Sequence, residues 1–209
     1  MQKPGCPIRR RTTPEVREAL LVAAVAELDE AGPEKASLRA IARRVGITHQ
    51  SVAHHFADRR ALFTAVAVRG FDNMHAEHMR ALEQLPDDAP LGEAVATLGQ
   101  VYIRFARDNR ATVALMMGSR LVDNKAPDLI AARARGWELH TRTVADAADH
   151  GWGGGVPGNL IAVATFAMAH GLAALETDFA DQLPDGTTGI DDLLSLVNAA
   201  IITPPQHDS

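Results

Sequence analysis

The sequence predicts an all-α protein with an N-terminal helix-turn-helix unit, a long connector helix and a larger C-terminal helical body. Apolar residues recur at the spacing of helix faces along most of the 209 residues. Glycine and proline punctuate these segments, as at Gly32-Pro33 and in the loop PDDAP at 86–90. We find no internal repeat and no stretch that alternates apolar and polar side chains as a half-buried strand would.

The first helix is expected to begin at Thr13-Pro14, with Thr13 as the N-cap and proline in the first turn, and to end at Gly32. Ser37 then caps a second, short helix, and Gly46 ends it. One face of this helix carries four apolar residues at i, i+3, i+4 and i+7: Leu38, Ile41, Ala42 and Val45.

Thr48 is a good N-cap for a third helix that is expected to run to about His55, with Val52 and Phe56 pointing inward. Two short helices joined by a turn that contains glycine are typical of a helix-turn-helix, whose second helix enters the major groove of DNA. A small helical hairpin without a role in DNA binding would show the same spacing. Spacing alone therefore leaves that alternative open.

Asp58 is expected to cap the long connector helix, which runs to about Leu85. Beyond the loop at 86–90, apolar spacing and proline starts predict the helices of the C-terminal body at 91–109, 110–119, 127–148, 160–175 and 191–202. The helix at 160–175 is apolar almost all round, which predicts that it is covered on both sides. Over this range it is too short for a membrane span, so we expect no membrane partner.

Charge is distributed unevenly along the chain. The formal net charge is −5, but residues 1–60 hold eleven Lys or Arg against seven acidic residues, whereas the remainder holds ten against nineteen. A basic N-terminal part on an acidic body is what a DNA-binding protein needs, because phosphate contacts require cations only there. Arg9-Arg10-Arg11, in a flexible arm at 1–12, either contact DNA or are simply solvated.

The rest of the composition is that of a soluble globular protein, with 46% hydrophobic and 22% charged residues. The single cysteine, Cys6, excludes an internal disulfide, and no apolar signal segment follows the early basic residues, so a cytoplasmic location is expected. We expect no cofactor and no metal. The histidines that could suggest a metal, His54, His55, His75 and His78, lack a cysteine or carboxylate to complete a set.

Three segments in order, LLVAAVAELDEAG, SLRAIARRVGIT and HHFADRRALFTAV, resemble the tetracycline-repressor (TetR) family of transcriptional regulators over residues 20–66. In the C-terminal half the resemblance is weaker and lies in FARDNRATVALMM, Trp137 and Ala169-His170-Gly171. The resemblance implies a helical homodimer with a DNA-binding domain at 13–57, the connector at 58–85, a ligand-binding and dimerisation domain at 86–203 and a tail at 204–209. It also favours repression over activation.

DNA contacts are expected from the exposed face of the third helix and from cations beside it. By resemblance the candidates are Arg39, Thr48, Gln50, Ser51, His54, His55 and Arg59, and His49 joins them on the exposed face. Gln50 is the best candidate for reading a base, since its amide can pair bidentately with adenine. The sequence departs from the family at Ala53, where many members have an aromatic residue. Either a phosphate contact and some packing are lost, with lower DNA affinity or an altered operator preference, or His54 compensates.

Two further surfaces are expected in the C-terminal body. A mostly apolar effector is expected to bind among Tyr102, Phe105, Met116, Met117, Trp137, His140, Phe166 and His170. Dimerisation is expected through the last two helices, with Leu160, Val163, Leu175, Leu194, Val197 and Ile201 in contact.

The sequence therefore predicts a dimeric, ligand-responsive regulator that binds a pseudo-palindromic operator. One alternative is a helical sensor that lost DNA binding. A helical enzyme is disfavoured, because no catalytic constellation is visible and the glycine-rich GWGGGVPG at 151–158 follows a helix rather than a strand.

Overall fold

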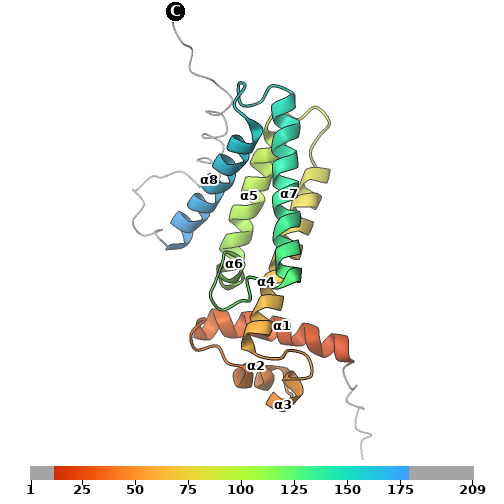
Figure 1. Ribbon diagram of the computed structural model, residues 1–209, viewed down its shortest axis with the longest axis vertical. Coiled ribbons are helices and arrows are strands. Elements are labelled where there is room, and N and C mark those ends of the chain that lie inside the picture. The colour runs from red at the N-terminus through yellow and green to blue at the C-terminus, as the bar shows by residue number, and fades with distance from the viewer. Residues whose placement is uncertain (1–11, 179–209) are drawn as a thin grey trace, which may run out of the picture.

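The structure, a computed structural model, describes residues 12–178, and that range is helical with no strand (Figure 1). This confirms the all-α prediction. The eight helices of the described range are α1 (Thr13–Ala31), α2 (Leu38–Val45), α3 (His49–Val52), α4 (Arg59–Glu83), α5 (Glu93–Asp108), α6 (Arg110–Met116), α7 (Pro127–Asp149) and α8 (Gly158–Asp178). The arm at 1–11 and the helix expected at 191–202 lie outside the described residues.

Helices α1, α2 and α3 form a small head at one end of the molecule (Figure 1). The N-cap of α1 is Thr12, one residue earlier than expected, because the backbone N–H of Thr12 donates to Glu15 Oε2 at 2.8 Å. Ser37 caps α2 as expected: its Oγ accepts from the N–H of Ala40 at 3.2 Å. Gly46 ends α2 in the left-handed region, with φ of +77°.

Helix α3 is shorter than predicted, since it ends at Val52 and not at about His55. The chain tightens here into i→i−3 hydrogen bonds, from Ala53 N–H to the Gln50 carbonyl and from His54 N–H to the Ser51 carbonyl. This turn brings Phe56 into the core before Asp58 caps α4 by accepting from Ala61 N–H at 2.7 Å.

The body is a bundle in which α4 packs against α5, α6 and α7, while α8 packs against α5 and α7. Helix α4 also contacts α1, so it runs from the head into the body (Figure 1). Helix α6 ends at Met116, before the predicted end at Ser119. The segment that follows includes Gly118, at φ of +87°, and leads to α7.

The described part of α8 is longer than predicted. We expected this helix to be too short to span a membrane, and its length does not support that expectation. Gly158–Glu176 is long and apolar enough to span a membrane by length and composition alone, and a core helix of a soluble protein passes the same test. The helix packs against α5 and α7, but only 28% of its apolar window is buried.

One buried cluster runs from the head into the body. It joins Leu20 of α1 and Ile41 of α2 through Phe63 of α4 to Ile103 of α5 and Leu129 of α7. A smaller cluster at the far end of the bundle surrounds Trp152. Because the head and the lower body share one core, a movement of α4 acts on both.

Candidate functional site

Helix α3 presents a polar face at the outer end of the head. Its side chains His49 and Gln50 are exposed, as is His54 in the turn that follows, and no hydrogen-bond or ion-pair partner holds them among the described residues. Thr48 instead caps α3: its Oγ1 accepts from Ser51 N–H at 3.1 Å, and the hydroxyl oxygens of Thr48 and Ser51 lie 2.8 Å apart. His55 is half-buried beside the core.

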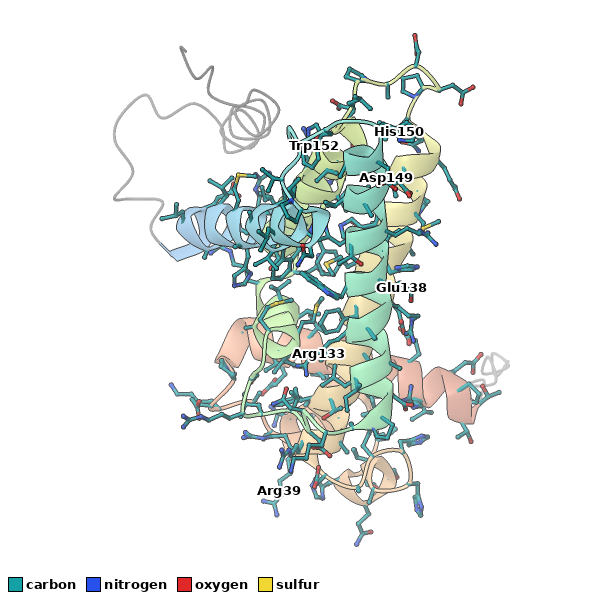
Figure 2. The ribbon with its side chains drawn as sticks, turned by 45° about the horizontal axis from the view of Figure 1, so that its top comes forward. Arg39, Arg133, Glu138, Asp149, His150 and Trp152 are labelled. Carbon is teal, nitrogen blue, oxygen red and sulfur yellow. The ribbon has the colours of Figure 1, made fainter. Side chains whose placement is uncertain are left out.

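The arginines of α2 differ in how they are held. Arg44 is bound to α1, because its Nε donates to Glu27 at 2.8 Å and its Nη2 to Glu30 at 2.5 Å. This pairing lowers the pKa of the Glu30 carboxyl through a hydrogen bond and charge attraction from Arg44. Arg39 is exposed at the end of the molecule opposite Trp152, so its charge is available to a partner (Figure 2).

Arg59, in the first turn of α4, is half-buried rather than free. Its Nη1 donates to the Ala36 carbonyl at 3.0 Å, and its guanidinium lies 5.5 Å from the centre of the Phe63 ring. The neighbouring Arg60 is more than half exposed and lies 3.8 Å from Asp123 Oδ1. Arg59 therefore ties α4 to the segment between α1 and α2, at the edge of the head.

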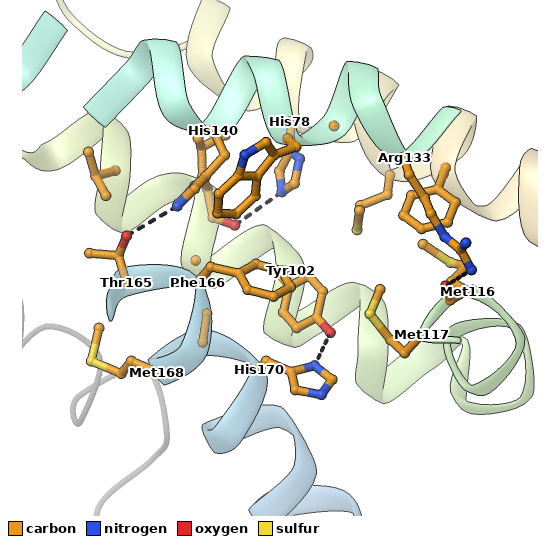
Figure 3. Close-up of a pocket in the computed structure, with 18 of the residues that line it drawn as sticks. His78, Tyr102, Met116, Met117, Arg133, His140, Thr165, Phe166, Met168 and His170 are labelled. Atoms are coloured by element: carbon orange, nitrogen blue, oxygen red, sulfur yellow. Dashed lines mark hydrogen bonds between the residues drawn. The ribbon is translucent and has the colours of Figure 1, made fainter. Parts of the chain in front are cut away.

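The body encloses a cavity of about 400 Å³ between α4, α5, α7 and α8, with the end of α6 closing one side (Figure 3). Each of the long helices offers one face to it. In α5, for example, Val95, Leu98, Gly99 and Tyr102 line the cavity at i, i+3, i+4 and i+7. Its volume lies in the range of small-molecule sites in proteins.

Seven of the eight residues expected around a pocket lie around this cavity: Tyr102, Met116, Met117, Trp137, His140, Phe166 and His170. The eighth, Phe105, lies on the same face of α5 as Leu98 and Tyr102 but one turn closer to the head. There it is buried in the main core. A helix rises about 1.5 Å per residue, and this displacement carries Phe105 beyond the end of the cavity.

The sequence did not reveal the contribution of α4 or three polar residues of the lining, His78, Arg133 and Thr165. The lining residues that it did not name include Phe71, Met74, His78, Leu98, Arg133, Thr165 and Met168. A polar residue in an otherwise apolar helix stripe was the available signal. His78 follows Phe71 and Met74 in this way, and Arg133 shares a face with Trp137 and His140.

Hydrogen bonds fix most polar groups of the cavity. Tyr102 Oη lies 2.6 Å from His170 Nδ1, and burial raises the pKa of Tyr102 to about 12, so the phenol stays protonated and can donate to that nitrogen. His78 Nε2 donates to the Leu98 carbonyl at 3.1 Å. His140 Nε2 lies 2.9 Å from the Ala162 carbonyl and 3.1 Å from Thr165 Oγ1.

Burial keeps two of these histidines neutral. It lowers the pKa of His78 to about 4, against a smaller raising effect of the Leu98 carbonyl. It also lowers the pKa of His140, with the Ala162 carbonyl again opposing. Both rings therefore act as uncharged hydrogen-bonding groups near neutral pH.

Phe166 of α8 is the centre of an aromatic group inside the cavity. Its ring meets Trp137 edge to face with centroids 5.7 Å apart, and it meets Tyr102 in the same manner at 6.1 Å. The His170 ring lies nearly parallel to it at 5.9 Å. Such contacts hold the lining in a defined shape that an apolar ligand can fill.

In the part of the chain that the structure describes, no group of three or more His, Cys, Asp or Glu side chains is placed to hold a metal ion. His54 is exposed on the head, whereas His78 is buried in the body, so these two do not meet. His75 Nδ1 is buried without a hydrogen-bond partner among the described residues.

Two family models match the sequence. Residues 20–66 match the bacterial regulatory proteins of the tetR family, and residues 95–196 match the tetracyclin repressor-like C-terminal domain. Comparison with curated proteins gave no significant match.

Among solved structures, a protein of unknown function from Rhodococcus sp. RHA1 is similar, with a TM-score of 0.79 and 29% identity over 94% of this chain and 97% of that chain. The TetR family transcriptional regulator PfmR from Thermus thermophilus is similar with a TM-score of 0.66 and 19% identity, over 88% of this chain and 96% of that chain. AibR, crystallised with isovaleryl coenzyme A and operator DNA, is similar with a TM-score of 0.67 and 16% identity, over 91% of this chain and 100% of that chain. At these identities the last two share the fold.

Proposed function

The chain belongs to the TetR family of transcriptional regulators, which are ligand-responsive DNA-binding proteins, and from that premise we propose that it is a dimeric repressor released from its operator by a small, mostly apolar effector. The observation that supports this most directly is the pairing of two surfaces on one core. An exposed polar helix, α3, lies at one end, and an apolar cavity lies in the body. Helix α4 contributes to the cavity and to the packing of the head.

On DNA, α3 would lie in the major groove with Gln50 against base edges. Its amide is exposed and offers the donor and acceptor that bidentate pairing with adenine needs. His49, His54 and Thr48 are exposed near it, while Ser51 and His55 are half-buried. Arg39 would neutralise a phosphate, since it is exposed and no ion pair holds it in the described structure.

We do not propose Arg59 as a freely exposed phosphate contact. Because its guanidinium is held by Ala36 and Phe63, it would reach the DNA backbone only from the edge of the head. Its first contribution is to fix α4 relative to the helix-turn-helix.

Dimerisation through α8 would place two heads on the two half-sites of an operator. Leu160, Val163 and Leu175 are 58%, 55% and 42% exposed, which is a large apolar exposure for one helix. The other three expected contacts, Leu194, Val197 and Ile201, lie outside the described residues.

An effector that fills the cavity would act on the heads through α4, which lines the cavity at Phe71, Met74 and His78. If the effector binds one head spacing more tightly than the other by a few kcal/mol, that difference is enough to change operator occupancy. The AibR structure, with both an acyl coenzyme A and operator DNA, shows one protein of this fold that holds a ligand and DNA together. A regulator of this kind acts where the DNA is, in the cytoplasm.

Retardation of DNA fragments from around the protein's own coding region tests the proposal. We expect one fragment to be retained specifically, with an affinity that falls steeply as salt increases. Gln50→Ala should reduce the preference for that fragment over random DNA about tenfold, because a good bidentate base contact contributes roughly 1–3 kcal/mol.

Gln84→Ala is the matched control, since Gln84 is exposed at the far end of α4. It should leave binding unchanged. If no fragment is retained specifically at low salt, the chain is a sensor without DNA binding and the proposal fails.

A further inference from the structure

The lining of the cavity is unbalanced in charge. Arg133 of α7 is one of its residues, and none of the described lining residues is Asp or Glu. The remaining polar side-chain groups are a phenol, a threonine hydroxyl, an indole N–H and three imidazoles, from Tyr102, Thr165, Trp137, His78, His140 and His170. The cavity therefore combines a mostly apolar wall with one permanent positive charge at its edge.

The bonds of Arg133 leave that charge uncompensated. Its Nη2 donates to the Met116 carbonyl at 3.1 Å and to Asn124 Oδ1 at 2.8 Å, and both acceptors are neutral. Its guanidinium also lies 6.0 Å from the centre of the Phe71 ring. No carboxylate pairs with it among the described residues, in contrast to Arg135, which Asp72 holds at 2.5 Å.

The histidines do not take the place of this cation. His78 and His140 bind backbone carbonyls, and burial keeps both rings uncharged near neutral pH. The third imidazole, His170, accepts a hydrogen bond from the Tyr102 phenol at Nδ1. A negatively charged ligand in the cavity would thus be recognised mainly by Arg133. The N–H groups on Nε and Nη1 make no hydrogen bond among the described residues, so each can donate to an oxygen of a carboxylate, whereas Nη2 is already used.

We propose that the cavity binds a monocarboxylic acid with an apolar body, its carboxylate on Arg133 and its body against the methionines and Phe166. The proposal takes from the proposed function only that this cavity is the effector site. Figure 3 shows Arg133 beside Met116 and Met117 at one end of the cavity, with His140 and Thr165 at the other. The apolar body would extend along the cavity between these ends.

The position of Arg133 also gives such a ligand a route to the head. Of its two partners, Met116 is the last residue of α6 and Asn124 lies in the segment between α6 and α7. A neighbouring residue of that segment, Asp123, donates its N–H to Thr64 of α4 at 2.8 Å. A carboxylate that draws the guanidinium toward the cavity would therefore disturb a segment that contacts α4.

The test is ligand binding to the full chain without DNA, measured by calorimetry and by the fluorescence of the Trp152→Phe variant, in which Trp137 is the only tryptophan. The probes are decanoate and naphthoate, each compared with its neutral amide. We expect at least one acid to bind about tenfold or more tightly than its amide, since a hydrogen bond to a charged group contributes about twice that of a neutral pair. Arg133→Gln should remove this preference and leave amide binding within about threefold.

Arg135→Gln is the matched control, because Arg135 lies two residues further along α7 and outside the lining. It should keep the preference for the acid. Thermal unfolding of each variant shows whether it is folded, and Arg133→Lys, which keeps the charge without the planar fork, should retain part of the preference.

Equal affinity for acid and amide in the wild-type protein would overturn the proposal, as would an acid preference that survives Arg133→Gln. Absence of binding by all four probes would overturn it too. So would decanoyl coenzyme A that binds more tightly than decanoate, if its affinity is unchanged in Arg133→Gln. Because no DNA is present, these results are independent of operator retardation. Acid binding without a retained fragment would leave this inference standing and refute the proposed repressor.

Discussion

The backbone N–H of Asp123 donates to Thr64 Oγ1 at 2.8 Å, and this bond joins the segment between α6 and α7 to the first half of α4. Thr64 in turn donates to the Arg60 carbonyl at 2.7 Å, and Arg60 lies within ion-pair distance of Asp123. One buried hydroxyl thus connects the body to the part of α4 that leaves the head. Together with Arg69 and Glu18, which pair at 2.5 Å between α4 and α1, it fixes how α4 sits on the head.

Replacing Thr64 by Val should destabilise the protein by about 1–3 kcal/mol, because the Asp123 N–H loses its acceptor in a partly buried place. Thr64→Ser keeps the hydroxyl and removes only a methyl group, so it is the matched control. Urea unfolding measures both. A valine variant that is as stable as the serine variant would show that this bond contributes nothing.

Ala53 is exposed at the C-terminal end of α3, so a larger side chain fits there without repacking. Ala53→Tyr should raise operator affinity several-fold, because the phenol could supply the phosphate contact that the family resemblance leads us to expect at this place. Ala53→Phe adds the ring without the hydroxyl and should give less of the gain. Equal gains in both variants, measured by fluorescence anisotropy, would assign the effect to packing instead.

Gly92 precedes α5 with φ of +84°, and a Cβ built there would overlap the indole of Trp152. Gly92→Ala should therefore cost both backbone strain and repacking of a buried ring, about 3 kcal/mol or more in the free energy of unfolding. Gly118 has a similar φ of +87° with nothing near its missing Cβ, so Gly118→Ala should cost only the strain, about 1 kcal/mol. Denaturant unfolding of the two variants measures the cost of repacking Trp152 as the difference between them. Equal losses of stability would show that no such cost exists.

The sequence was sufficient to predict the helices wherever a cap or a breaker marks an end, as Ser37, Gly46 and Asp58 do. It was less accurate at α3, where tertiary packing of Phe56 decides the last turn, and at α8, where no polar face or cap marks the boundary. Local periodicity reports which face is apolar. It does not report where a neighbouring helix stops.

The same limit explains the site. The apolar stripes of α5 and α8 indicated Tyr102 and Phe166, but whether a stripe residue lines a cavity or fills the core depends on its height along the bundle. Phe105 lies below the cavity for that reason. The spacing of Arg133 from Trp137 and His140 could have placed it on the cavity face, but its lack of an acidic partner among the described residues follows only from the packing of the helices.

Stability should depend on pH through His78. Folded His78 stays neutral until the pH falls to about 4, its lowered pKa, whereas the unfolded chain takes up a proton near the ordinary pKa of 6.5. The unfolded state therefore binds more protons between these values, so stability is full above pH 6.5 and is lost as the pH falls. The loss on going from pH 7 to pH 5 should be on the order of 2 kcal/mol from this group.

His78→Gln tests this assignment, because an amide can still donate to the Leu98 carbonyl but does not titrate. Urea unfolding at pH 7 and pH 5 should show a smaller loss in the variant than in the wild-type protein. The pKa of His140 is also lowered, so some pH dependence in the same direction should remain in the variant. An equal pH dependence in the two would exclude His78 as its source.

Dimerisation through α8 should fail when its exposed apolar face receives charges. Leu160 and Val163 are each more than half exposed on this helix, and a stable dimer would desolvate them, so Leu160→Glu with Val163→Glu would bury two uncompensated carboxylates. We expect the double variant to be a monomer by analytical ultracentrifugation while remaining helical by circular dichroism. It should also lose specific operator binding, because one head alone reads only a half-site.

Ile130→Glu is the control, since Ile130 is 52% exposed on α7, away from the proposed interface. It should stay dimeric. Leu175, further along α8, offers a second test: Leu175→Glu should weaken the dimer if the interface extends along the helix, and dimerisation unaffected by any α8 charge would mean that another surface joins the two copies.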